Sequence, residues 1–331
     1  MAFARLRTPG TPAPTAGPTA GTPTAGPTAG TPTAGPRPAR RRRLRPITAL
    51  ATGLGLVAGS LGLWAAGGSA AADTAAALPS PDHVVVVVLE NHAYSQVIGS
   101  SSAPYVNHTL VAGGAKLTQS YALTHPSQPN YYMLFSGSAQ GVTDDSCVDV
   151  GALQEPNLAS ELLAANQTWA SYNEGLPAVG ATDCRVDNYA QKHNPWFGFG
   201  NVPTSSAYGM DAFPTDFTTL PKVSFVVPDL CDDMHDCSVG TGDTWLQDNL
   251  DAYAQWAKSN NSLLVVTFDE DNRLAGNRIP TIVYGAHVAP GSSTATRYNH
   301  YDVLHTLEDL AGVNAHAGNS AGASDITGIW N

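Results

Sequence analysis

The stretch HVVVVVLEN, residues 83–91, decides the fold of this chain. Its five consecutive valines are typical of a β-strand. The run is apolar at both odd and even positions, so both faces of the strand should be buried, as in parallel sheets covered by helices on both sides. The stretch therefore predicts a central strand that ends in two polar residues, Glu90 and Asn91.

Four other short apolar runs predict further strands, and three segments with apolar residues at three- and four-residue spacing predict helices between them. The strands are TWASY (168–172), VSFVVP (223–228), SLLVVTF (262–268) and IPTIVYG (279–285), and the helices are 157–166, 244–259 and 300–312. This alternation predicts an α/β fold, a mostly parallel central sheet with helices on both faces. The chain has no P-loop, no G-x-S-x-G elbow and no G-x-G-x-x-G after the first strand, which disfavours nucleotide-binding and ordinary α/β-hydrolase chemistry.

The N-terminal part of the 331-residue chain differs in composition from the rest. Residues 1–46 repeat Thr, Pro, Ala and Gly and predict a disordered leader. The basic run ARRRRLRP (39–46), a weakly polar segment and the AAA at 70–72 predict a Sec or Tat export signal over residues 47–72. An uncleaved membrane anchor is the alternative. After cleavage, we expect residues 73–331 to form one secreted or cell-envelope domain, monomeric and without stable membrane insertion.

The charge of this domain excludes some partners. Residues 1–72 carry eight arginines and no acid, so the remainder has eight basic residues against 27 acidic ones and a net charge near −19. Such a chain lacks the basic surface of proteins that bind nucleic acids or anionic membranes. If its substrate carries phosphate, a metal ion or a few chosen side chains must supply positive charge.

Four cysteines remain in the domain. In an exported chain this even number favours two disulfides. The short segment from Cys231 to Cys237 closes naturally on itself, which leaves Cys147 to pair with Cys184. A zinc site is the alternative, although the chain has no C-x-x-C pair.

Polar side chains follow four of the predicted strands, and the carboxyl ends of parallel strands are where open sheets bind ligands. They are Glu90-Asn91, Asn173-Glu174, Asp229 and Asp269-Glu270. Clustered carboxylates repel one another unless a cation neutralises them. Glu90, Asn91, Asp269 and Glu270 are therefore predicted to bind one divalent metal, with a solvated acidic loop edge as the alternative.

A serine lies between two prolines in HPSQPNYYM, residues 125–133. The prolines restrict the backbone around Ser127, and Pro129 is typical of a first helical turn. Ser127 is thus predicted at the beginning of a helix, where an anion is favoured, and it is a candidate phosphoryl acceptor. The alternatives are a helix cap for Ser127 and a backbone cap for Asn130, which could otherwise donate to a phosphate oxygen.

Further polar residues are candidates for substrate contacts. Asp232, His235 and Asp236 lie within PDLCDDMHDC (228–237) and suggest a second metal or a general acid. His300 opens the last helix and could protonate a leaving group, while Lys192 and His193 could bind phosphate. The alternatives are an exposed loop, a capping histidine and surface residues.

At these positions the chain resembles the acid phosphatase/phospholipase C-type phosphoesterase family, a branch of the alkaline-phosphatase-like superfamily. The resemblance covers roughly residues 82–315 and looks closest to the secreted bacterial acid phosphatases, some of which act on phosphoinositides. It rests on LENHAY (89–94), HPSQPNY (125–131), YNEG (172–175), KHNP (192–195), PDLCDDMHDC (228–237), FDED (268–271) and NHYDVLHTLED (299–309).

The resemblance implies an alkaline-phosphatase-like sandwich over residues 73–331, with Ser127 at the position of the phosphorylated nucleophile. It implies that Glu90, Asn91, Asp269 and Glu270 bind metal. Phospholipase C-type relatives have a TxPNR motif in which Tyr131 replaces the arginine, and this departure favours the phosphatase branch. Phosphate and leaving-group contacts are implied for His125, Lys192, His193, His235, Asp236 and His300.

We therefore expect an exported, metal-assisted acid phosphatase that hydrolyses phosphate monoesters, phosphoinositides among them, through a phosphoserine intermediate. The partner is a small phosphorylated substrate or a lipid headgroup. An all-oxygen site suits Mg²⁺ or Ca²⁺, and a histidine-containing one admits Zn²⁺. The alternatives are a phospholipase C-type phosphodiesterase and a secreted binding module stabilised by calcium.

Overall fold

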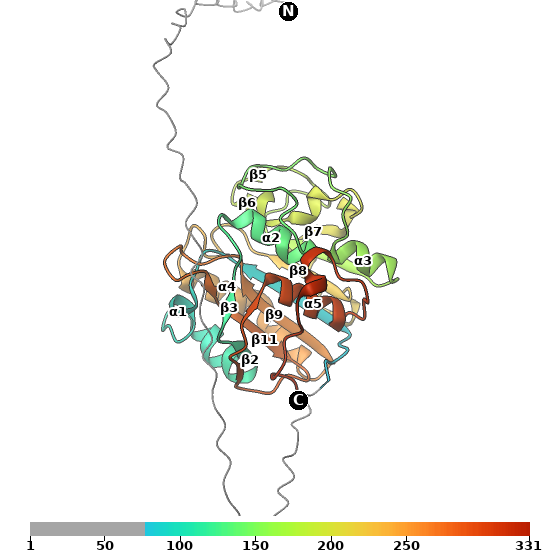
Figure 1. Ribbon diagram of the computed structural model, residues 1–331. Coiled ribbons are helices and arrows are strands. Elements are labelled where there is room, and N and C mark those ends of the chain that lie inside the picture. Colours follow the sequence, from blue (N-terminus) through green and yellow to red (C-terminus); the bar gives the residue numbers. More distant parts are fainter. Residues whose placement is uncertain (1–76) are drawn as a thin grey trace, which may run out of the picture. The chain divides into compact units, whose positions relative to one another are not determined.

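The computed structural model describes residues 77–331 of the chain (Figure 1). The predicted leader at 1–46 and export signal at 47–72 lie outside these described residues. Within them, no helix is long and apolar enough to cross a bilayer.

An eight-stranded sheet forms the centre of the molecule, in the order β12-β2-β11-β9-β1-β8-β4-β7. Its strands are β1 (His83–Leu89), β2 (Ala115–Leu117), β4 (Trp169–Asn173), β7 (Ala207–Gly209), β8 (Val223–Val227), β9 (Ser262–Phe268), β11 (Thr281–Gly285) and β12 (Ser292–Thr294). The strands β9, β1, β8, β4 and β7 run parallel to one another, whereas β11 is antiparallel to β9 and β2. The predicted α/β fold with a mostly parallel sheet is confirmed.

Two small sheets accompany it: β10 (Arg278–Ile279), β3 (Ser120–Tyr121) and β13 (Tyr298–Asn299) form one, and β5 (Arg185–Val186) and β6 (Tyr189–Ala190) form the other. The predicted strand 279–285 is divided between β10 and β11 at Pro280. Proline has no N–H to donate to a strand ladder, which explains the division.

Helices cover both faces of the large sheet. They are α1 (Tyr94–Val97), α2 (Ser127–Ser136), α3 (Leu158–Ala164), α4 (Val239–Ala257) and α5 (His300–Leu310), with a π-helix at Val106–Val111 and short 3₁₀ turns at Gln191–His193, Pro195–Gly198, Thr204–Ser206, Met210–Ala212, Phe217–Thr219 and Gly318–Gly322. Side chains of α2, α3 and α5 pack in one core cluster, and those of α4 and the π-helix pack in the other. The predicted helix 244–259 begins earlier, at Val239, because Ser238 caps it by accepting a hydrogen bond from the backbone N–H of Thr241.

The central strand β1 explains this two-sided arrangement. Val84, Val86 and Val88 face the first core cluster, and Val85, Val87 and Leu89 face the second. All six are fully buried. The reading of HVVVVVL as a strand buried on both faces is therefore confirmed.

Parallel pairing fixes where the functional side chains lie. Leu89 of β1 is in register with Phe268 of β9, and Asn173 of β4 is in register with Val227 of β8. Because β9, β1, β8 and β4 are consecutive neighbours in the sheet, their carboxyl ends share one edge.

Both predicted disulfides are present, Cys147–Cys184 and Cys231–Cys237. Two disulfides are consistent with an extracellular location.

Candidate functional site

Two carboxylates meet at the ends of β1 and β9. Glu90 is fully buried and Asp269 is 1% exposed. Asn91, in the left-handed backbone region at φ 56°, links them. Its backbone N–H donates to Asp269 Oδ1 over 2.9 Å, and its side-chain amide donates to Glu90 Oε2 over 2.9 Å. The predicted metal ligands Glu90 and Asp269 are therefore close together, and Asn91, a third predicted ligand, donates a hydrogen bond to each.

Ser127 faces this pair. It is the first residue of α2, as predicted, with Pro126 at the N-cap. Its hydroxyl is buried and donates to Glu90 Oε2 over 2.9 Å. A hydroxyl in this position has both a proton acceptor and the positive end of a helix beside it.

Tyr131 and His193 complete the surroundings of Glu90. The Tyr131 hydroxyl donates to Glu90 Oε1 over 2.5 Å, and His193 Nε2 lies 3.2 Å from the same oxygen. The Tyr131 and His193 rings stack with centroids 5.0 Å apart. On its other side, His193 Nδ1 lies 3.2 Å from Asp233 Oδ2. Burial lowers the pKa of His193 well below its usual range, which leaves a neutral imidazole able to act as a ligand.

Asp233 is a site residue that the sequence analysis missed. It is fully buried, and its backbone carbonyl accepts from the N–H of Glu90 over 2.8 Å. Two predicted candidates of the same segment, His235 and Asp236, pair with each other at 2.7 Å and are partly exposed. The signal available was the Asp232-Asp233 pair, but four acids in one short segment cannot be ranked without knowing which of them points inward.

Glu270, the residue after Asp269, contacts residues in α2 and just before it. Its Oε2 lies 2.9 Å from His125 Nδ1 and 3.4 Å from the amide nitrogen of Asn130. The Asn130 amide oxygen accepts from the backbone N–H groups of Leu123 and Thr124. Asn130 is thus engaged in holding the loop before α2.

Lys192 is a cationic side chain close to the site. Its Nζ lies 3.1 Å from Asp145 Oδ2 and 3.4 Å from His235 Nε2. Asp145 Oδ1 accepts in turn from the backbone N–H of Gln128, the second residue of α2. Although burial lowers the pKa of Lys192, the charges of Glu90 and Asp145 raise it above its usual value. The Lys192 side chain is therefore a charged ammonium.

His300 contacts the backbone of Asp269, one of the predicted metal ligands. It is 1% exposed, and its Nε2 is 2.7 Å from the backbone carbonyl of Asp269. Burial lowers the pKa of His300 to about 4, so the ring is neutral and positions the Asp269 backbone.

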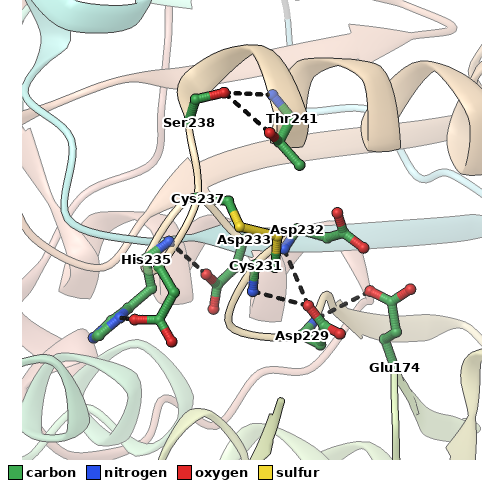
Figure 2. The surroundings of a disulfide bond; sticks show 10 residues. Glu174, Asp229, Cys231, Asp232, Asp233, His235, Cys237, Ser238 and Thr241 are labelled. Atoms are coloured by element: carbon green, nitrogen blue, oxygen red, sulfur yellow. Dashed lines mark hydrogen bonds and ion pairs between the residues drawn. A yellow bond between two sulfur atoms is a disulfide. The ribbon is translucent and has the colours of Figure 1, made fainter.

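The polar strand ends share one edge, as predicted, but their side chains form two groups. Glu174 and Asp229, at the ends of β4 and β8, lie with Asp232 beside the Cys231–Cys237 disulfide (Figure 2). Glu174 accepts from the backbone N–H of Asp229, and Asp229 accepts from those of Cys231 and Asp232. This second group orders the disulfide loop that carries Asp233 and His235.

The donor set around Glu90 suits a divalent cation. Glu90, His193 and Asp233 each offer one ligand atom, all within 4.8 Å of one another. Asp269 Oδ2 and Asp233 Oδ2 are buried and without a hydrogen-bond partner. Burial, and then the charges of Asp269 and Asp233, raise the pKa of Glu90 well above its usual range. In residues 77–331, no lysine or arginine forms an ion pair with these three carboxylates, so a metal ion would relieve their repulsion.

Comparison with known proteins gives independent evidence on the family of this chain. Residues 102–314 match the model of the Phosphoesterase family. A phosphatidylinositol-3-phosphatase of Mycobacterium tuberculosis is 48% identical over 294 residues, which cover 86% of this chain and 96% of that protein. A probable acid phosphatase of Kluyveromyces lactis is 27% identical over 74% of this chain and 63% of its own length. A solved structure of an alkaline phosphatase superfamily protein from Vibrio parahaemolyticus has the same fold, with a TM-score of 0.54 and 15% identity over 73% of this chain and 69% of that one.

Proposed function

This chain belongs to the Phosphoesterase family, and from this membership we propose that it is a metal-assisted phosphatase in which Ser127 attacks phosphorus. The resemblance seen in the sequence is confirmed, and the chain is a phosphoric monoester hydrolase. Its relatives are phosphatases, which favours a monoesterase over a phospholipase C or a binding module. The observation that carries the mechanism is the hydrogen bond from the Ser127 hydroxyl to the buried Glu90 carboxylate.

Ser127 is the nucleophile because its surroundings favour loss of its proton. Glu90 Oε2 accepts that proton as the Oγ–phosphorus bond forms and the ester bond breaks. Negative charge at the phosphoryl oxygens is favoured by the positive end of the α2 dipole and by Lys192. Water then attacks the phosphoserine, and phosphate leaves as Ser127 regains a proton.

The metal would be held by Glu90 and Asp269, with Asp233 and His193 beside them and Asn91 and Glu270 as the remaining candidates. The unpartnered oxygens of Asp233 and Asp269 fit this assignment. Bound there, a divalent ion supplies positive charge to the phosphoryl oxygens and favours ionised Ser127. With His193 in the set, Zn²⁺ is admitted alongside Mg²⁺ and Ca²⁺.

His235 protonates the leaving group. Its ring is about one third exposed, its Nδ1 lies 2.7 Å from Asp236 Oδ1, and its Nε2 is 3.4 Å from Lys192 Nζ. Asp236 accepts a hydrogen bond from Nδ1–H and stabilises the imidazolium, which gives its Nε2 proton to the leaving group and becomes neutral. His300, by contrast, acts through the Asp269 backbone as a positioning residue.

Phosphoinositides are the proposed substrate class. The support is the phosphatidylinositol-3-phosphatase relative, which matches this chain over nearly its whole length. Secretion is proposed from the predicted export signal, and the two disulfides are consistent with it.

The covalent mechanism is tested by acid-quenching the enzyme during turnover of phosphatidylinositol 3-phosphate and mapping the phosphopeptides by mass spectrometry. Phosphate on Ser127, which chases to inorganic phosphate, is expected. Turnover without any phosphoserine, together with full activity of Ser127→Ala, would overturn the proposal. A parallel assay on phosphatidylcholine separates the monoesterase from a phospholipase C.

A further inference from the structure

A separate group of side chains that could bind a metal lies around the C-terminal half of α5. At the other end of α5, His300 contacts Asp269 of the Ser127 site. We call it the α5 cluster. It combines side chains of α3, α5 and the chain that follows α5: Glu161, His305, Glu308, Asp309, His316 and Asp325.

The two histidines of the α5 cluster face one carboxylate. His305 Nδ1 lies 2.8 Å from the carbonyl oxygen of Ser320, an acceptor, so Nδ1 carries the proton. In a neutral ring the Nε2 atom then has a free lone pair, yet it lies 3.6 Å from Asp309 Oδ2, which is also an acceptor. His316 Nε2 is 3.0 Å from the other oxygen of Asp309. Two acceptors that face each other require a cation or an added proton between them.

The ring geometry keeps the histidines in this arrangement. The His305 and His316 rings stack with centroids 4.1 Å apart and an interplanar angle of 11°. A histidine ligand whose other ring nitrogen donates to a backbone carbonyl is the usual arrangement at metal sites, because that bond fixes the tautomer and the ring orientation. His305 has this arrangement through Ser320.

Two buried carboxylates adjoin the histidines. Glu308 is fully buried and accepts from the backbone N–H of Ala317 and the hydroxyl of Ser320. Glu161 is 8% exposed, and its Oε2 has no hydrogen-bond partner. Burial, together with the charge of the neighbouring Glu161, raises the pKa of Glu308 to about 8. An unpartnered buried carboxylate oxygen is costly, and it points to a group that completes the cluster.

Asp325 is a further carboxylate near His305 that has an unpartnered oxygen. Its Oδ1 also lacks a partner, and burial followed by the charge of Asp309 raises its pKa. His305 offers a ligand atom within 4.8 Å of those of Glu308 and His316, and also within 4.8 Å of those of Asp309 and Asp325. Within the described residues, Asp309 forms ion pairs with His305 and His316, and no carboxylate of the α5 cluster forms one with lysine or arginine.

We propose that the α5 cluster binds a divalent transition-metal ion, with Zn²⁺ favoured over Mg²⁺ and Ca²⁺, through His305 and His316 together with the surrounding carboxylates. Imidazole nitrogen suits Zn²⁺, whereas Mg²⁺ and Ca²⁺ prefer oxygen alone. The ion would connect α3, α5 and residues 316–325, and so fix the helix whose first residue, His300, supports Asp269. Its role is structural and separate from the Ser127 chemistry.

The test counts metal ions in the full exported domain. Wild type, the double variant His305→Gln/His316→Gln and the control His108→Gln are stripped with a chelator, saturated with Zn²⁺, desalted and analysed by mass spectrometry of the metal. His108 is exposed and lies in the π-helix, outside both sites. The double variant should retain one zinc fewer per chain than wild type, and the control should retain the same number. Equal zinc content in all three proteins would overturn the proposal and leave a shared proton as the explanation of the cluster.

A measurement on the wild-type chain alone covers the case in which the double variant does not fold. Zn²⁺ added to the metal-free protein should shift the imidazole ¹H–¹⁵N NMR signals of His305 and His316, whereas Mg²⁺ should not. Unshifted signals at saturating Zn²⁺ would contradict the assignment. Neither readout uses phosphatase activity, so failure here leaves the proposed role of Ser127 untouched.

Discussion

The Ser127 hydroxyl donates to the Glu90 carboxylate over 2.9 Å, although 37 positions separate the two residues in the chain. One residue begins a helix and the other directly follows a strand. Their contact joins the positive end of α2 to the carboxylates at the sheet edge. The proposed nucleophile, its proposed proton acceptor and the positive end of a helix, which favours an anion, are thereby brought together.

Ser127→Ala should lower kcat on the order of 10⁴-fold or more, since removal of a nucleophile removes the covalent route. The loss of one buried hydrogen bond should cost about 1 kcal/mol of unfolding free energy. Ser136→Ala is the matched control, because Ser136 is a buried serine at the other end of α2. It should lose similar stability and keep its turnover. Equal kcat values for the two variants in a phosphate-release assay would contradict the nucleophile assignment.

Tyr131→Phe should lower kcat/KM about 10- to 100-fold, because a hydrogen bond to a charged group contributes about 1.5–3 kcal/mol. The lost bond is the one to Glu90 Oε1. Tyr132→Phe provides the control, since the neighbouring Tyr132 hydroxyl is buried without a partner. Its kinetics should match wild type. A Tyr131→Phe enzyme with unchanged kcat/KM would show that Glu90 does not depend on this donor.

His235→Asn should slow alkyl phosphates by about 10²- to 10⁴-fold, the usual contribution of a general acid. The effect on p-nitrophenyl phosphate should be much smaller, because nitrophenolate leaves without protonation. His300→Asn should slow both substrates by the same factor, because His300 contacts only the Asp269 backbone among the site residues. Equal losses on both substrates for His235→Asn would remove it from the proton-transfer role.

Lys192→Gln and Asp145→Asn should have opposite effects on phosphate binding. Lys192 supplies positive charge near Ser127, so its loss should weaken competitive inhibition by inorganic phosphate. Asp145 pairs with Lys192 and accepts from the N–H of Gln128, so it competes with phosphate for both donors. Asp145→Asn should therefore tighten phosphate inhibition. Inhibition constants that move in the same direction would contradict this competition.

The metal-free protein should lose stability as pH rises. Burial, and then the charge of Glu270, raise the pKa of Asp269 to about 7, and burial raises that of Glu270 to about 7. Between about pH 4 and 7 the folded chain retains protons that the unfolded chain releases, so stability decreases through this range and levels off above it. A saturating divalent ion, which binds ionised carboxylates, should flatten the decrease. Thermal melts at several pH values, with and without metal, check both statements. A Tm that rises with pH in the metal-free protein would contradict them.

Much of the fold could be predicted from the sequence because each central strand is apolar on both faces. In HVVVVVL, polar and apolar residues do not alternate, so neither face of the strand can be assigned to solvent. The run therefore predicts a strand buried on both faces. The position of Ser127 could also be predicted, because two prolines restrict the backbone around it.

Other features required three dimensions. Asp233 could not be separated from Asp232 and Asp236, because only the path of the disulfide loop turns it toward His193. His300 follows a clear helix-start pattern, but the sequence does not reveal that its ring faces the Asp269 backbone. The polar residues at the strand ends form two separate groups because their side chains point in different directions at the sheet edge. The spacing of residues in the sequence does not reveal these directions.

The parallel register of β1 and β9 has a consequence for how this enzyme becomes active. Asn91 and Asp269 are 178 positions apart, and they meet only when the chain has closed that whole loop. A fragment that ends before Asp269 lacks this contact, so the proposed chemistry requires synthesis of the chain through β9 and the pairing of β9 with β1. Hydrolysis is therefore a reporter of completed assembly, and an exporter that moves the chain unfolded would deliver a protein with no premature activity.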